Sequence, residues 1–213
     1  GFGVAFDGDA DRALFVDGNG NLVDGDATLW AMACFMQNRG ELKNATVVAT
    51  VMSNLGLEVA LKSKNINLVR AKVGDKYVLE ELLKTKSTLG GEQSGHIIFP
   101  DKSLVGDGIF TALSLLEAMQ TNKSSLAELT NGFKQFPQIL INVKVREKLP
   151  FESVPKIAAA AKDLENELGT RGRLVLRYSG TESLARVMIE GEHQEIINAQ
   201  AKNLAMIIKQ ELQ

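Results

Sequence analysis

The stretch Asp7-Gly8-Asp9-Ala10-Asp11-Arg12, near the start of the chain, places three carboxylates at alternate positions between the apolar runs 2–6 and 13–16. Three like charges this close repel one another, and each is costly to remove from water without a compensating positive charge. A hard divalent cation such as Mg²⁺ supplies that charge, because it prefers oxygen ligands and shares them with substrate phosphates. The spacing therefore predicts a divalent-cation site in this loop.

The acidic loop has three other interpretations. An Asp/Gly-rich turn between two strands needs no ligand. A calcium-binding EF-hand is excluded, because that motif requires Gly at its sixth position and Glu at its twelfth, where this chain has Arg12 and Gly18. A phosphatase with Asp7 or Asp9 as nucleophile is the third, and Asp11 argues against it because phosphatase loops of this type usually carry Thr there.

A second loop, residues 90–96, carries three glycines in seven residues, which let its backbone approach another molecule closely. Glu92 and Ser94 alternate, so extended backbone points both side chains to one side. A carboxylate beside a hydroxyl suits neighbouring sugar hydroxyls, and His96 can exchange a proton near neutral pH. The alternative is a Gly-rich turn with a hydrogen-bonded histidine.

A third loop, residues 177–183, combines a guanidinium, hydroxyls and a glycine, with Arg186 close behind. Such groups form an anion cradle of the kind that binds phosphate. A polar turn with a surface arginine is the alternative. Lys72 and Lys76 flank a further tight turn at a predicted helix start, where either could face phosphate or solvent.

Strands and helices must position these loops, and their alternation predicts an α/β fold with a βαβ-type mixed-sheet domain. Residues 1–6 are expected to form a buried strand that is already under way, which suggests a fragment of a longer protein. Asp26 is predicted to cap a helix that ends near Gln37, and Asp75 to cap one that ends near Lys84. After Pro137 the predicted order is β-α-β-β-α, a small α+β unit, with its first helix over residues 151–168.

Composition narrows the function classes. The chain has 213 residues, of which 45% are hydrophobic and 23% charged, and a net charge of −2, so no basic field favours nucleic acid or an anionic membrane. No apolar run reaches transmembrane length, and no signal-peptide pattern opens the chain. A single cysteine, Cys34, excludes an internal disulfide framework and is expected to be a buried, inert thiol in a reducing cytoplasm.

Four stretches carry a family resemblance: "GVAFDGDADR", "VGDKYVLEEL", "GGEQSGHIIF" and "RYSGTESLARVMIEG". In this order and spacing they resemble the α-D-phosphohexomutase family, and most closely its members that act on glucosamine phosphates. The resemblance runs from residue 1 to the C-terminus. It implies four domains around a cleft, of which residues 1–25 end the second and carry the metal loop, residues 26–136 form the third, sugar-binding α/β domain, and residues 139–213 form the fourth, phosphate-binding domain.

The resemblance also implies a role for each loop residue. The metal ligands for Mg²⁺ are Asp7, Asp9 and Asp11. The catalytic groups are Arg12, beside the reacting phosphate, and His96, as a candidate proton shuttle. The groups that bind substrate are Glu92, Ser94, Lys76, Arg177, Ser179, Gly180, Thr181 and Arg186.

The reaction that the resemblance implies moves a phosphoryl group between the 6- and 1-hydroxyls of glucosamine through a phosphoserine and a bisphosphate intermediate. The family's phosphoserine lies in a "SASHNP"-like loop that this sequence lacks, so the chain alone is expected to be inactive. Phosphomannomutase or phosphoglucomutase activity, or a non-catalytic sugar-phosphate-binding fragment, are the alternatives. The partner is a small hexose or hexosamine phosphate, and a homodimer is compatible with the sequence.

The fourth-domain loop departs from the family pattern at two positions. Tyr178 and Ser183 stand where the family commonly carries Pro. Because proline fixes φ, its absence predicts a looser loop around an intact Arg177, Ser179 and Thr181.

Overall fold

The computed structural model describes all of residues 1–213. The acidic loop connects its first two short strands. Strand β1 (Gly3–Phe6) pairs antiparallel with β2 (Ala13–Val16), and β3 (Leu22–Val23) follows a tight turn to complete a sheet of order β1-β2-β3. The strand predicted over residues 1–6 is present, but the expectation that it is buried is wrong. All four residues of β1 are exposed, and no residue of this edge strand belongs to a buried hydrophobic cluster.

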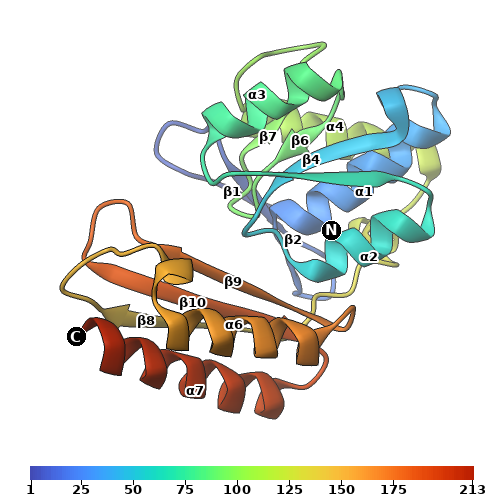
Figure 1. Ribbon diagram of the computed structural model, residues 1–213. Helices are drawn as coiled ribbons and strands as arrows, with labels where there is room; N and C mark the ends of the chain where they lie inside the picture. The colour runs from blue at the N-terminus through green and yellow to red at the C-terminus, as the bar shows by residue number, and fades with distance from the viewer. The chain divides into compact units, whose positions relative to one another are not determined.

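A second sheet, of order β5-β4-β6-β7, lies at the centre of the first unit, residues 1–135 (Figure 1). Strand β4 is parallel to both β5 and β6, whereas β6 and β7 are antiparallel, so the sheet is mixed as the sequence predicts. The strands are β4 (Thr46–Thr50), β5 (Asn67–Ala71), β6 (Gly90–Gly91) and β7 (Ile97–Ile98).

Helices cover both faces of the mixed sheet. Side chains alternate between the two faces along β4, and β4 is fully buried because both faces are covered. Val47 and Ala49 belong to the core that includes α1, while Val48 belongs to a separate cluster with Val78 and Leu82 of α3. The helices of this unit are α1 (Gly25–Asn38), α2 (Leu55–Ser63), α3 (Asp75–Thr85), α4 (Gly108–Asn122) and α5 (Leu126–Thr130), with a 3₁₀ turn η1 (Lys43–Ala45). No helix of the chain has the length and apolar character that a membrane span requires.

Two predicted helix caps are corrected. Helix α1 is capped by Asp24, whose Oδ1 accepts from the Ala27 N–H at 3.0 Å, and not by Asp26. Asp26 lies inside the helix and is fully buried, where its Oδ2 accepts from the Asn54 N–H at 2.7 Å. Helix α3 is preceded by Gly74 at φ +125°, which makes Asp75 its first helical residue. A cap needs extended backbone, which Asp26 and Asp75 do not have.

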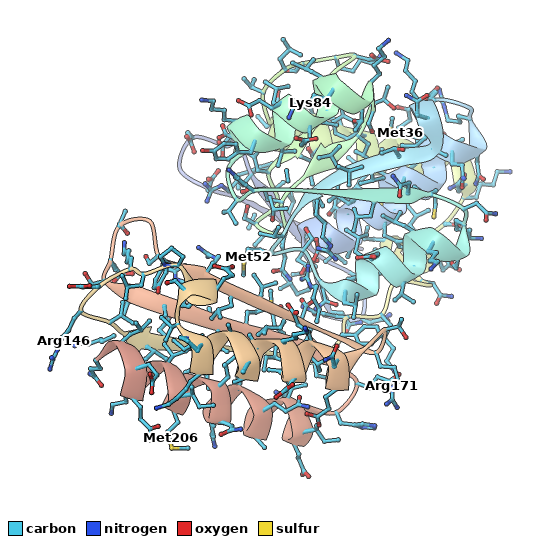
Figure 2. All side chains as sticks on the ribbon, viewed as in Figure 1. Met36, Met52, Lys84, Arg146, Arg171 and Met206 are labelled. Atoms are coloured by element: carbon cyan, nitrogen blue, oxygen red, sulfur yellow. The ribbon has the colours of Figure 1, made fainter.

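The second unit, residues 136–213, is a three-stranded antiparallel sheet of order β8-β10-β9 with two helices packed on it (Figure 1). Figure 2 shows Met206 on the side of α7 that faces away from the sheet, and this residue is 55% exposed. The elements are β8 (Gln138–Lys144), η2 (Phe151–Ser153), α6 (Pro155–Leu168), β9 (Gly172–Tyr178), β10 (Leu184–Gly191) and α7 (Gln194–Leu212). The predicted helix 151–168 is split into η2 and α6, since Pro155 takes the first helical position.

Candidate functional site

The three aspartates of the acidic loop converge. Asp7, Asp9 and Asp11 each offer a carboxylate oxygen, and these oxygens all lie within 4.8 Å of one another. The Arg12 Nε atom is 3.6 Å from Asp7 Oδ2 and 3.7 Å from Asp11 Oδ1, so one guanidinium lies beside two of the three carboxylates. Asp11 Oδ1 is buried and has no hydrogen-bond partner. The excess negative charge and this unsatisfied oxygen fit a hard divalent cation.

Glycines far along the chain hold the acidic loop in place. The Ala13 N–H donates to Gly95 O at 3.2 Å, and the Gly108 N–H donates to Ala10 O at 2.9 Å. A Cβ on Gly95 would lie 2.3 Å from Ala13 O, and one on Gly108 would lie 2.7 Å from Arg12 O. Only glycine permits these backbones to approach so closely. Sequence reasoning missed Gly108. It marked Gly95 as one of three glycines that allow close backbone approach, but assigned that approach to another molecule and not to the acidic loop.

His96 lies against the acidic loop and is only 6% exposed. Its Nδ1 is 3.2 Å from Asp11 Oδ2, whereas its Nε2 is buried without a hydrogen-bond partner. Gly106 packs on the ring so closely that a Cβ there would lie 2.4 Å from Nε2. The structure therefore brings His96 to a candidate metal ligand, and its role as a proton shuttle stays a prediction.

The Gly-rich loop and the turn before α3 meet at one carboxylate. Glu92 Oε1 accepts from the Gly74 N–H at 2.9 Å, and Ser94 Oγ donates to Glu92 Oε2 at 3.4 Å. The two side chains thus contact each other, but through a turn at residues 93–95 and not through the extended backbone on which the prediction rested. Lys76 follows Gly74 but its side chain is 76% exposed, with Nζ 4.0 Å from Glu80. The protein therefore does not hold the Lys76 side chain in place for the phosphate contact that the sequence predicts.

Two arginines face each other across the sheet of the second unit. Arg177 on β9 and Arg186 on β10 are direct cross-strand partners. Burial lowers the pKa of the Arg177 guanidinium, and the nearby charge of Arg186 lowers it further. Glu182 is the acidic partner of Arg186, at 3.5 Å, and its side chain is 59% exposed. The pair therefore concentrates positive charge beside the loop at residues 179–183.

That loop begins with a buried residue, Ser179, and continues with the exposed residues Gly180 and Thr181. Ser179 is 2% exposed, and its Oγ accepts from the Glu182 N–H at 3.3 Å and from Arg186 Nη2 at 3.4 Å. Gly180 and Thr181 are exposed, and their backbone N–H groups donate to no acceptor within the protein. A Cβ on Gly180 would meet no atom within 4 Å. Free N–H groups beside guanidinium charge are suited to an anion.

Models of known families match both units of the chain. Residues 24–136 match "Phosphoglucomutase/phosphomannomutase, alpha/beta/alpha domain III", and residues 140–207 match "Phosphoglucomutase/phosphomannomutase, C-terminal domain". The chain belongs to this family. The resemblance to the α-D-phosphohexomutases is thereby confirmed, as is the fold class. The assignment of residues 1–25 to a second family domain stays a prediction.

Relatives within the family are phosphoglucosamine mutases. The one from Koribacter versatilis is 56% identical over 209 residues, which is 98% of this chain and 45% of the relative. The one from Solibacter usitatus is 49% identical over 211 residues, 99% of this chain and 47% of the relative. The chain is therefore a phosphoglucosamine mutase-like region of the phosphohexomutase family, and it spans about half the length of these curated relatives.

Solved structures share the fold at low identity. An N-acetylphosphoglucosamine mutase from Aspergillus fumigatus, in complex with GlcNAc-6P and magnesium, gives a TM-score of 0.79 at 24% identity and covers 97% of this chain and 52% of that one. A phosphoglucomutase/phosphomannomutase family protein from Burkholderia thailandensis gives 0.77 at 22% identity and covers 99% of this chain and 46% of that one. At these identities the likeness speaks for the fold alone.

Proposed function

We propose that this chain is the metal-binding and sugar-phosphate-binding part of a phosphoglucosamine mutase, an enzyme that interconverts glucosamine 6-phosphate and glucosamine 1-phosphate. The observation that carries the proposal is the convergence of three carboxylates within 4.8 Å, in a chain that is 56% identical to a phosphoglucosamine mutase. Neither observation suffices alone, since exposed acidic clusters are common and the relative is about twice as long.

Asp7, Asp9 and Asp11 are the proposed ligands of Mg²⁺. The unsatisfied Asp11 Oδ1 and the shared direction of the carboxylates support this assignment. When bound, Mg²⁺ supplies positive charge that offsets the charge of a transferring phosphoryl group. Arg12 lies beside the same carboxylates, and its side chain is 51% exposed, so it is free to bind the reacting phosphate.

Substrate binding is assigned to the other two loops. Glu92 uses one oxygen for the Gly74 N–H and keeps the other beside Ser94, where both can bind sugar hydroxyls. Arg177, Arg186 and the free N–H groups of Gly180 and Thr181 are proposed to bind the phosphate that does not react, and Ser179 shapes that loop from within. His96 and Lys76 are the candidates for the base that accepts the proton of the attacking hydroxyl.

The first test measures turnover. A coupled assay follows glucosamine 1-phosphate formation by this chain and by the product of the whole reading frame that contains it, with a bisphosphate activator present. We expect turnover only from the longer protein, since no "SASHNP"-like loop exists in this sequence. Full turnover by the chain alone would contradict the need for that loop. A faster rate with mannose 6-phosphate or glucose 6-phosphate would favour a phosphomannomutase or a phosphoglucomutase.

The second test measures the metal directly. Isothermal titration of the longer protein with Mg²⁺ is compared with a variant that carries Asp7→Asn, Asp9→Asn and Asp11→Asn. We expect the substitutions to abolish measurable binding, because neutral amides replace all three charged ligands. Unchanged affinity together with surviving catalysis would refute the metal site.

A further inference from the structure

Residues 148–151 of the second unit contact the start of the proposed phosphate-binding loop. Lys148 Nζ donates to the carbonyl oxygen of Ser179 at 2.7 Å. The Tyr178 hydroxyl donates to the carbonyl oxygen of Leu149 at 2.6 Å, and the Tyr178 ring stacks on Phe151 with centroids 4.2 Å apart and an interplanar angle of 15°. These three contacts tie residues 148–151 to two consecutive residues at the start of the loop.

The contact of Lys148 has a consequence for the open side of the loop. The carbonyl of Ser179 and the N–H of Gly180 belong to one planar, trans peptide, so they point in opposite directions. Holding the carbonyl on Lys148 therefore fixes the direction in which the Gly180 N–H points. The ammonium charge on the carbonyl also polarises the peptide and strengthens that N–H as a donor.

The contacts of Tyr178 replace a restraint that the sequence lacks. Proline fixes φ by its ring, and its absence at position 178 predicts a looser loop. Here the stacking on Phe151 and the hydrogen bond to Leu149 immobilise the side chain instead. Burial raises the pKa of the Tyr178 phenol, as does the charge of Glu152, so the hydroxyl keeps the proton that it donates.

We propose that residues 148–151 form a brace that sets the affinity of loop 179–183 for a phosphate monoester, with Lys148 and Tyr178 as positioning residues. The brace holds Ser179 from the protein side and leaves the N–H groups of Gly180 and Thr181 directed to the open side. This proposal rests on the proposed function of the loop, and it adds residues that touch the loop and not the ligand.

The test follows phosphate binding at single residues. The chain labelled with ¹⁵N is titrated with inorganic phosphate and, separately, with glucosamine 6-phosphate, and the amide shifts of Gly180 and Thr181 give a dissociation constant. We expect Lys148→Met to weaken binding about tenfold and Tyr178→Phe about threefold, which is the scale of one lost hydrogen bond. Tyr178→Phe changes no charge, so its effect separates positioning from general electrostatic attraction.

A matched control exists on the same unit. Lys156 lies on α6, where its Nζ is 2.7 Å from Glu211, and Lys156→Met removes one positive charge of the unit without touching the brace. We expect this variant to bind phosphate as the unmodified chain does. If Lys148→Met and Tyr178→Phe also bind as the unmodified chain does, with circular dichroism unchanged, the proposal is overturned.

A second measurement needs no ligand. Hydrogen exchange of the Ser179 and Glu182 amides, which donate to Leu184 O and to Ser179 Oγ, is expected to be faster in both variants than in the Lys156→Met control. Unchanged exchange would show that residues 148–151 do not hold the loop. If the amide shifts of the unmodified chain do not change with phosphate, the proposed phosphate site is refuted. If the unmodified chain and both variants bind phosphate equally well, only the brace is refuted.

Discussion

His96 Nδ1 lies 3.2 Å from Asp11 Oδ2, and this contact joins the Gly-rich loop to the acidic loop at the more buried of the three aspartates. The ring is confined between Asp11 and the backbone of Gly106. Groups that contact metal ligands from behind orient them, and their removal typically costs 10–100-fold in metal affinity. We therefore expect His96 to position Asp11 at the candidate metal site.

Replacing His96 tests that geometric role. We expect His96→Leu to weaken Mg²⁺ binding by about 10–100-fold, because it fills the space but leaves Asp11 without its polar neighbour. His96→Asn is expected to stay within a few-fold of the unmodified chain, since its amide can occupy the place of Nδ1. Calorimetry with Mg²⁺, or electron paramagnetic resonance with Mn²⁺, measures both. His193→Asn, at the exposed start of α7, is the control, and a His96→Leu variant that binds as this control does would disprove the role.

Gly95 tests whether close backbone approach holds the acidic loop. We expect Gly95→Ala to lower the free energy of unfolding by about 2–3 kcal/mol, because the residue has φ +94° and its Cβ would lie 2.3 Å from Ala13 O. Gly3→Ala is the matched control: no atom lies within 4 Å of its Cβ, and a change within about 0.5 kcal/mol is expected. Urea unfolding measures the stability of both variants, and equal stabilities would refute the role of Gly95 in holding the acidic loop.

Replacing Arg177 is expected to affect the stability of the chain and its affinity for phosphate in opposite directions. Because Arg177 and Arg186 are direct cross-strand partners, their repulsion costs about 0.2–1 kcal/mol, which Arg177→Met relieves. We therefore expect this variant to unfold at an equal or slightly higher urea concentration, while it binds phosphate at least about tenfold more weakly. A variant that loses both stability and binding would show that Arg177 is a structural residue and would count against the anion site.

Cys34 gives a prediction about pH. Burial raises the pKa of this half-buried thiol to about 11, so roughly one molecule in a thousand carries a thiolate at pH 8. Alkylation by iodoacetamide at pH 8 is expected to be slow in the folded chain and about a hundredfold faster in guanidinium chloride. Equal rates in the two conditions would contradict the raised pKa.

The same thiol affects stability at high pH. The unfolded thiol loses its proton near its ordinary pKa of 9.0, whereas the folded thiol keeps it up to about 11. The unfolded state therefore binds fewer protons in this window, and the thiol's contribution to stability falls as pH rises from about 9 to about 11. Cys34→Ala should remove this part of the pH dependence in urea unfolding, and an unchanged pH profile would refute it.

Local chemistry was predictable from the sequence. The alternate aspartates of residues 7–11, the facing pair Glu92 and Ser94, and the strand and helix periodicities all depend on residues within a few positions of one another. The mixed sheet and the β-α-β-β-α order of the second unit follow from those periodicities, and both are confirmed. For the same reason the four sequence motifs sufficed to predict the family.

The tertiary structure decided which of these groups touch. The approach of His96 to Asp11, the approach of Gly95 to Ala13 and the brace at Lys148 all depend on packing between segments far apart in the chain. Such contacts require distant segments to be placed with a precision of about a few tenths of an ångström, because the interior is closely packed, and local residue patterns do not encode that placement. The sequence by itself therefore determined the chemistry that the loops carry, and only the folded chain determined which atoms hold that chemistry in place.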